Sequence, residues 1–149
     1  MNNCCVLPSN GVVIDKTFAF PVRVYYEDTD AGGIVYYANY LKFAERARSE
    51  FLRYMGINQQ QNLEEKHTGF IVRSCSVEYL KSAVLDDALQ VTCQVGEVGA
   101  ASAVINQEIR RGDEILATVS VKVIHMNVTT HRPTRIPVDM VEKFQKFTA

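Results

Sequence analysis

Several features that often reveal a protein's class are scarce in this sequence. The 149-residue chain has no tryptophan, four prolines and four cysteines. The cysteines (Cys4, Cys5, Cys75 and Cys93) form no C-x-x-C pair, so their spacing indicates neither a zinc site nor a disulfide framework. No apolar run approaches 18 residues, so we expect no transmembrane helix. Cys75 and Cys93 lie in apolar runs, which predicts small core residues in a reducing, cytoplasmic setting.

An excess of one charge sign is also missing. The chain has 16 Lys+Arg and 17 Asp+Glu, a formal net charge of −1, which gives no reason to expect nucleic acid or a membrane surface as a partner. The histidines (His67, His125 and His131) are isolated, without metal-ligand spacing, and no serine lies in a nucleophile-elbow motif. The sequence therefore predicts no metal site.

The length favours one domain, which we place at residues 17–149. Residues 1–16 lack a basic region followed by a continuous apolar stretch, so no signal peptide is expected. We interpret residues 1–16 as a loosely held extension.

Alternating apolar residues predict a strand over Phe18–Glu27, with Tyr26 on its apolar face and Pro21 indicating an edge position or a bulge. Four later strands follow from the same period, over Phe70–Leu80, Ala88–Val98, Ala101–Arg110 and Glu114–Asn127. Short turns between most of them demand antiparallel neighbours. Val138–Phe147 is expected as a short terminal helix, and Gln59–Lys66 as a short polar one.

The stretch Tyr26–Met55 organises the chain. It places Asp28 and Asp30 directly before a Gly-Gly turn and then begins the longest helix-periodic segment, which we expect to end at Gly56. One largely covered helix against an antiparallel sheet is an α+β domain. Such a turn allows a carboxylate and unpaired backbone N–H groups to converge on one small substrate group.

The string from Tyr26 to Tyr40, YEDTDAGGIVYYANY, followed by Glu45-Arg46-Ala47-Arg48, resembles the hotdog-fold acyl-CoA thioesterases of the 4-hydroxybenzoyl-CoA thioesterase superfamily. Within it the sequence is most similar to the Tol-Pal-associated acyl-CoA thioesterases. One position departs from this group: it usually has His where this chain has Tyr37. The 4-hydroxybenzoyl-CoA enzymes have Tyr there, as this chain does. The resemblance implies a hotdog fold, an antiparallel sheet wrapped around one long central helix.

The resemblance also implies chemistry at two residues. Asp30 is expected to be the general base or the nucleophile for thioester hydrolysis, and the alternative from the residues alone is an Asx-turn before the glycines. The backbone N–H of Tyr37, with Gly33 leading toward it, is expected to polarise the thioester carbonyl. Asp28 is expected to order the turn. No organic cofactor is implied.

Other side chains are candidates for substrate contact. Asn39 either caps the helix or touches substrate, and Glu45 is either a surface partner of Arg46 or Arg48 or a group near the acyl pocket. Lys81, Arg132 and Arg135 are candidates for the phosphates of coenzyme A, or form a solvated basic rim.

The resemblance implies a homodimer or homotetramer with the site between subunits. Two other functions stay open: an acyl-carrier-protein thioesterase or binding protein of envelope phospholipid metabolism, and a non-catalytic Tol-Pal module.

Overall fold

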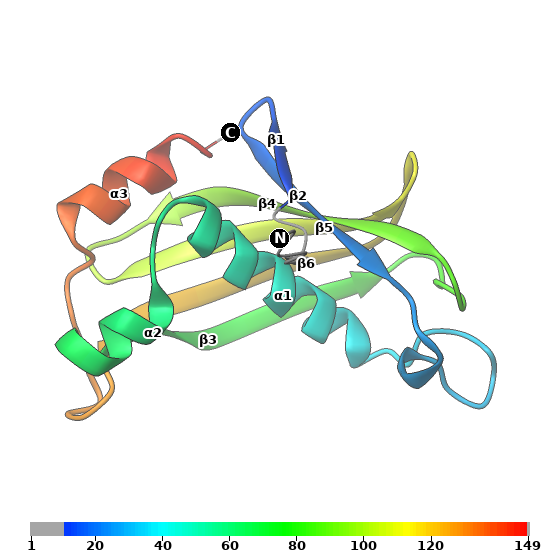
Figure 1. Cartoon of the computed structure of the whole chain (residues 1–149), viewed down its shortest axis with the longest axis horizontal. Helices are drawn as coiled ribbons and strands as arrows, with labels where there is room; N and C mark the ends of the chain where they lie inside the picture. The colour runs from blue at the N-terminus through cyan, green and yellow to red at the C-terminus, as the bar shows by residue number, and fades with distance from the viewer. Residues whose placement is uncertain (1–10, 149) are drawn as a thin grey trace, which may run out of the picture.

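The computed structural model describes residues 11–148. One antiparallel sheet lies behind a long helix, with a smaller helix near the C-terminus (Figure 1). The elements are β1 (Val12–Ile14), β2 (Thr17–Arg23), η1 (Tyr26–Asp28), α1 (Asn39–Tyr54), α2 (Gln59–Gln61), η2 (Asn62–Lys66), β3 (Thr68–Tyr79), β4 (Ala88–Val98), β5 (Ser102–Arg111), β6 (Glu114–Asn127), β7 (Arg132–Pro133) and α3 (Val138–Gln145). The predicted α+β architecture is therefore confirmed.

The strand order is β1-β2-β4-β5-β6-β3, with β7 added beside β6. The hairpins β4–β5 and β5–β6 join neighbours, whereas β3 pairs with β6 at the far edge. The face toward α1 is the predicted alternating one, with Val91 and Val95 of β4 opposing Ile109 and Ile105 of β5 across the ladder. This face and α1 enclose the core.

Helix α1 buries one stripe and leaves its other positions half-buried or exposed. Phe43, Ala44, Ala47 and Phe51 are at most 1% exposed against the sheet. Their spacing of three and four residues is the helical period that the sequence showed. Gly56 ends the helix with φ +79°, a left-handed angle that favours glycine, as predicted.

The strand predicted over Phe18–Glu27 is shorter in the structure. β2 ends at Arg23, and the chain turns into η1, so Tyr26 is 84% exposed rather than on the apolar face. Pro21 lies beyond the part of β2 that β1 pairs, which agrees with the predicted edge position.

The sequence did not predict β1 or β7, because these strands have only three and two residues. β1 pairs with β2 at Ile14–Thr17, so residues 12–14, predicted as loosely held, belong to the sheet.

Residues 1–10, with Cys4 and Cys5, lie outside the described residues. Cys75 is exposed on the edge strand β3, so its predicted core position is wrong, whereas Cys93 is buried.

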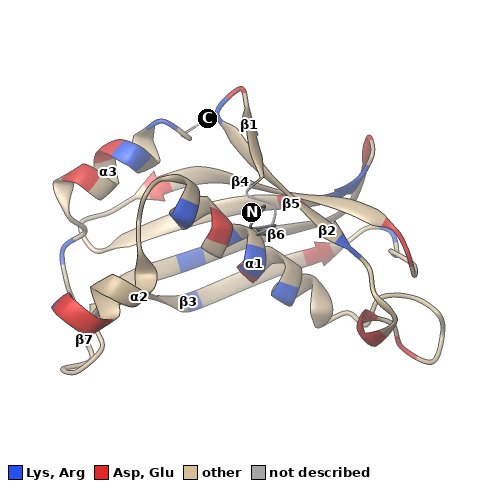
Figure 2. Ribbon diagram, viewed as in Figure 1, with Lys and Arg blue, Asp and Glu red and all other residues tan. Residues whose placement is uncertain are grey.

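Charge is distributed over helices, strand ends and loops without one sign dominating (Figure 2). Within residues 11–148, no helix is long and apolar enough to cross a bilayer. In the same residues, His, Cys, Asp and Glu form no group of three that could hold a metal ion.

Candidate active site

The loop from η1 to α1 is built around Asp28. Its side chain is 8% exposed, and its Oδ2 accepts a hydrogen bond from the Tyr25 N–H at 2.8 Å. Its carbonyl oxygen accepts from the Tyr36 N–H at 3.0 Å and from the Asn39 Nδ2 at 2.9 Å. Asp28 therefore orders the loop, as expected.

Asn39 does not cap the helix. Ala38 occupies the N-cap position, where no side chain bonds to the helix N–H groups. The Asn39 amide is turned back to the Asp28 carbonyl instead, so it ties the first turn of α1 to the loop. The predicted capping role is wrong because Asn39 is the first residue of α1, one position past the N-cap.

Asp30 lies at the start of a tight turn. Thr29 and Val35 face each other across a short antiparallel bridge, and the Gly33 N–H bonds to the Asp30 carbonyl at 3.1 Å. Gly33 has φ +83°, so this turn requires a residue that tolerates the left-handed region. The carboxylate of Asp30 is exposed, and its Oδ1 accepts the Gly32 N–H at 2.8 Å. The Asx-turn is thus present, and it leaves Oδ2 without a hydrogen bond from the described residues.

Tyr37 lies just before α1 and is 61% exposed, so it is not part of the buried stripe. Among the described residues its backbone N–H has no hydrogen-bond acceptor. N–H groups at a helix start have no partner within the helix, and the helix dipole makes that end positive. The Tyr37 N–H can therefore donate to an oxyanion.

A second loop, residues 80–87, supports the first. Ile34 bridges Val84, and the Val35 N–H donates to the Ala83 carbonyl at 2.9 Å. The Ala83 N–H in turn donates to the hydroxyl of buried Tyr40 on α1. The Asp30 turn, the second loop and α1 are thereby held as one unit.

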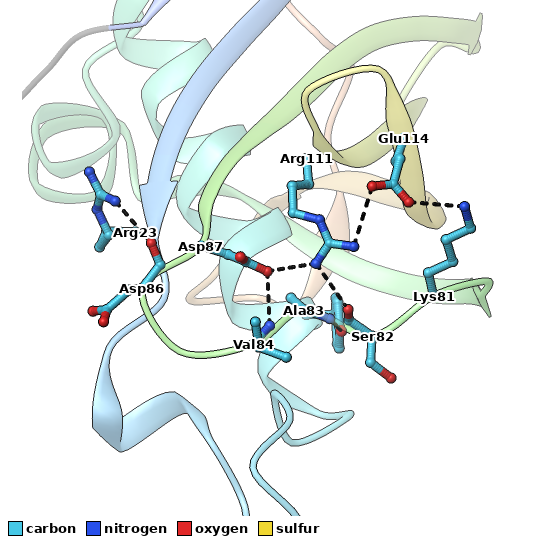
Figure 3. Close-up of polar contacts among 10 residues, drawn as sticks. Arg23, Lys81, Ser82, Ala83, Val84, Asp86, Asp87, Arg111 and Glu114 are labelled. Atoms are coloured by element: carbon cyan, nitrogen blue, oxygen red, sulfur yellow. Dashed lines mark hydrogen bonds and ion pairs between the residues drawn. The ribbon is translucent and has the colours of Figure 1, made fainter.

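An ion-pair network holds this second loop to the β5–β6 hairpin (Figure 3). Arg111 Nη1 lies 2.8 Å from Asp87 Oδ2, which also accepts the Val84 N–H at 2.9 Å. Burial opposes ionisation of Asp87, but the bonds from Val84 and Arg111 outweigh it and lower the carboxyl pKa. Glu114 joins Arg111 to Lys81, whose Nζ lies 2.9 Å from Glu114 Oε2.

Within a single chain, the three basic residues predicted to contact the phosphates of coenzyme A do not lie together. Lys81 lies on the second loop, next to the start of β6, where it bonds to Glu114. Arg132, on β7, pairs with Asn127 at the other end of β6, and Arg135 follows it. A 14-residue strand spans roughly 45 Å, so these arginines lie far from Lys81.

Glu45 is exposed on α1 and forms no ion pair within 4.0 Å with a described residue, so the predicted surface pair is not formed. Arg48 instead points toward the sheet, where its Nη1 donates to Gln107 Oε1 at 2.9 Å. Burial lowers the pKa of the Arg48 guanidinium, and Glu45 partly offsets this by Coulomb attraction. Burial likewise raises the pKa of the Cys93 thiol to about 12, which disfavours its reactive thiolate form.

A family model described as the thioesterase-like superfamily matches residues 24–144, from the Asp30 loop to α3. The chain belongs to the thioesterase-like superfamily.

Individual thioesterase-like relatives agree. The chain is 42% identical over 132 residues to an acyl-CoA thioesterase, YbgC, of Haemophilus influenzae, covering 89% of this chain and 97% of the relative. It is 39% identical over 130 residues to the acyl-CoA thioester hydrolase YbgC of Escherichia coli O157:H7, covering 87% and 96%. The prediction that the chain is a thioester hydrolase is confirmed.

Solved structures of thioesterases confirm the hotdog fold. A probable thioesterase from Bartonella henselae superposes with a TM-score of 0.78 at 33% identity, covering 81% of this chain and 99% of that one. A 1,4-dihydroxy-2-naphthoyl-CoA thioesterase from Synechocystis superposes with a TM-score of 0.81 at 19% identity, covering 87% and 96%. At that identity the second likeness concerns the fold alone.

Proposed function

We propose that this thioester hydrolase cleaves acyl-CoA to a free carboxylic acid and coenzyme A, with Asp30 and the Tyr37 N–H as its reacting groups. The support is that relatives named for acyl-CoA hydrolysis align over nearly the whole chain. The observation that carries the proposal is one loop presenting an exposed carboxylate and, at a helix start, an N–H that has no acceptor among residues 11–148.

Asp30 acts in one of two ways. As a general base, its carboxylate takes a proton from water while the water oxygen attacks the thioester carbon. As a nucleophile, it attacks that carbon and forms a mixed anhydride, which water then hydrolyses. In both cases the C–S bond breaks, the thiolate of coenzyme A takes up a proton, and the acyl group leaves as the acid.

The Tyr37 N–H stabilises the negative charge that develops on the carbonyl oxygen. The removal of one such donor typically lowers kcat by about 100- to 1,000-fold. Because the donor is main chain, the departure from His to Tyr at this position leaves it intact. The phenol of Tyr37 is 61% exposed and is free to contact substrate.

A second copy of the chain is needed to cover the site. In the described structure β3 has a partner on one side only, and Val72 and Tyr79 on its helix-facing side are 48% and 45% exposed. A long unpaired edge is stable when another strand pairs with it. We infer a homodimer in which β3 pairs with its own copy about a two-fold axis.

This arrangement also assigns the two distant arginines. An antiparallel β3 pair places the end of one β3 near the start of the other, where Thr68 pairs with Asn127 and Asn127 with Arg132. Arg132 and Arg135 of one subunit would then lie near the Asp30 loop of the other, where the phosphates of coenzyme A enter. Glu45 and Asn39 would face the covered groove. Tetramer formation and Tol-Pal association stay predictions from the resemblance, and a cytoplasmic location stays a prediction from the cysteines.

The test replaces Asp30 with Asn. The Asn side-chain oxygen keeps the bond from the Gly32 N–H, so the turn is preserved, but an amide is neither a base nor a carboxylate nucleophile. We expect kcat for acyl-CoA hydrolysis to fall about 100- to 10,000-fold, measured by release of free thiol. Glu27→Gln, which neutralises an exposed carboxylate three residues earlier, is the matched control and should be fully active.

Retention of more than a third of the activity by Asp30→Asn would refute the assigned role. The same assay with acyl-CoAs from acetyl to palmitoyl, one aromatic acyl-CoA and an acyl-carrier-protein thioester defines the substrate. Turnover of the protein-linked thioester alone would replace acyl-CoA as the proposed substrate.

A further inference from the structure

The main chain at Tyr37 is held on both sides, by different elements. On one side, the Asn39 N–H donates to the Tyr36 carbonyl at 2.8 Å. The Tyr36 carbonyl and the Tyr37 N–H belong to the same planar peptide and point in opposite directions. A carbonyl drawn toward Asn39 therefore turns the Tyr37 N–H away from the helix.

On the other side, no backbone N–H of the described residues donates to the Tyr37 carbonyl. The Leu41 N–H, which would reach it in a regular α-helix, bonds to the Ala38 carbonyl at 3.2 Å instead. The donor to the Tyr37 oxygen is the hydroxyl of Tyr79, at 2.9 Å. Tyr79 is the last residue of β3, 42 positions along the chain.

The ring of Tyr79 is itself held in place. It makes edge contacts with Tyr40, at 5.4 Å between centroids, and with Tyr37, at 6.3 Å. Tyr40 is 3% exposed and is fixed through its own hydroxyl by the Ala83 N–H. Burial is the main cause that raises the pKa of the Tyr79 hydroxyl, and Coulomb interaction with Tyr37 is the next. The hydroxyl therefore stays protonated at neutral pH and remains a hydrogen-bond donor.

We propose that Tyr79 is a positioning residue for hydrolysis: its hydroxyl fixes the peptide after Tyr37 so that the Tyr37 N–H keeps its aim at the thioester oxygen. This rests on the proposed function and extends it to a residue on the edge strand. With both peptides flanking Tyr37 held by hydrogen bonds, the two backbone angles of that residue are set. Without the hydroxyl, one of these peptides is free to rotate.

The consequence is specific to the chemical step. Oxyanion stabilisation depends on a donor already in place, because its benefit is realised when charge develops in the transition state. A misplacement of about 1 Å can reduce a rate by about 100-fold. Loss of the Tyr79 hydroxyl should therefore lower kcat and leave KM nearly unchanged.

The experiment compares Tyr79→Phe with Tyr54→Phe, both in the full chain. Phe keeps the ring contacts and removes only the hydroxyl. We expect Tyr79→Phe to lower kcat about 10- to 100-fold with KM within twofold, and Tyr54→Phe, on the last turn of α1 and away from the loop, to match the wild type. Melting temperature and molecular mass in solution, measured for each variant, should not change.

Two results would overturn the proposal: a kcat for Tyr79→Phe within twofold of the wild type, or a loss that lies entirely in KM. A fall in kcat accompanied by unfolding or dissociation would overturn it as well, since Tyr79 would then act on the fold. Asp30→Asn in the same assay tests the carboxylate separately. Full activity there, with a slow Tyr79→Phe, would reject the role of Asp30 and retain that of Tyr79.

Discussion

The buried amide of Gln107 joins the central helix to the sheet, and its removal gives a prediction for stability. Gln107 lies on β5, is 2% exposed and accepts from Arg48 Nη1 at 2.9 Å. Its Nε2 donates to the Ala44 carbonyl at 2.9 Å and to the Cys93 sulfur at 3.3 Å. Gln107→Leu keeps the approximate volume and removes all three contacts.

The magnitude follows from these contacts. A hydrogen bond to a charged group contributes about 1.5–3 kcal/mol and a neutral one about 0.5–1.5 kcal/mol. The bond from Arg48 is of the first kind, because its guanidinium is charged and partly desolvated. Burial of the added leucine carbons recovers about 1 kcal/mol. We expect a net loss of about 2 kcal/mol in the free energy of unfolding.

The assay is thermal and urea unfolding at one fixed protein concentration, because the stability of an oligomer depends on concentration. For a domain of about 150 residues, 2 kcal/mol lowers the melting temperature by about 4–8 °C. Arg48→Met with Gln107→Leu is the matched double variant. It should be no less stable than Gln107→Leu alone, because both polar partners are then removed together.

A Gln107→Leu protein as stable as the wild type would refute this reasoning. It would mean that the Arg48 guanidinium is fully satisfied by solvent and that the network adds nothing to the docking of α1. A double variant much less stable than either single one would also contradict it, since the two side chains would then act independently.

Two further predictions concern the site and its covering. Gly33→Ala has open space for its Cβ but must adopt φ +83°, so we expect a loss of about 1–2 kcal/mol in unfolding free energy and reduced activity; an unchanged melting temperature would contradict it. Val72→Glu on β3 should convert a dimer to monomers in light scattering, whereas Val12→Glu on the opposite edge should not; a dimeric Val72→Glu protein would rule out the β3 interface.

Local sequence determined the elements. The bounds of β4 and β6 match the predicted ranges, because strict alternation bounded by turn residues is a property of neighbouring positions. The same holds for the end of α1 at Gly56, where one left-handed angle decides the outcome. Errors arose where a segment is short: β1 and β7 have three and two residues, too few for a period to show.

The sequence named candidate side chains for the site, but not the contacts that each one makes. Asp28 orders the loop as predicted, because its bonds reach residues close in sequence. Asn39 was expected either to cap the helix or to touch substrate, and the structure turns its amide to a carbonyl 11 positions away. Lys81 and Arg132 were grouped for one role, and the length of β6 separates them within a chain.

Only the tertiary structure decided the contacts across the sheet. Tyr79 reaches Tyr37 because β3 pairs outside β6 and so ends beside the start of α1, 42 positions earlier. Arg48 bonds to Gln107, 59 positions along the chain, for the same reason. The order of the strands in the sheet, not the spacing of residues in the sequence, decides which side chains are in contact. Periodicity fixes the face on which a residue lies, whereas its partner across that face depends on how distant strands are arranged.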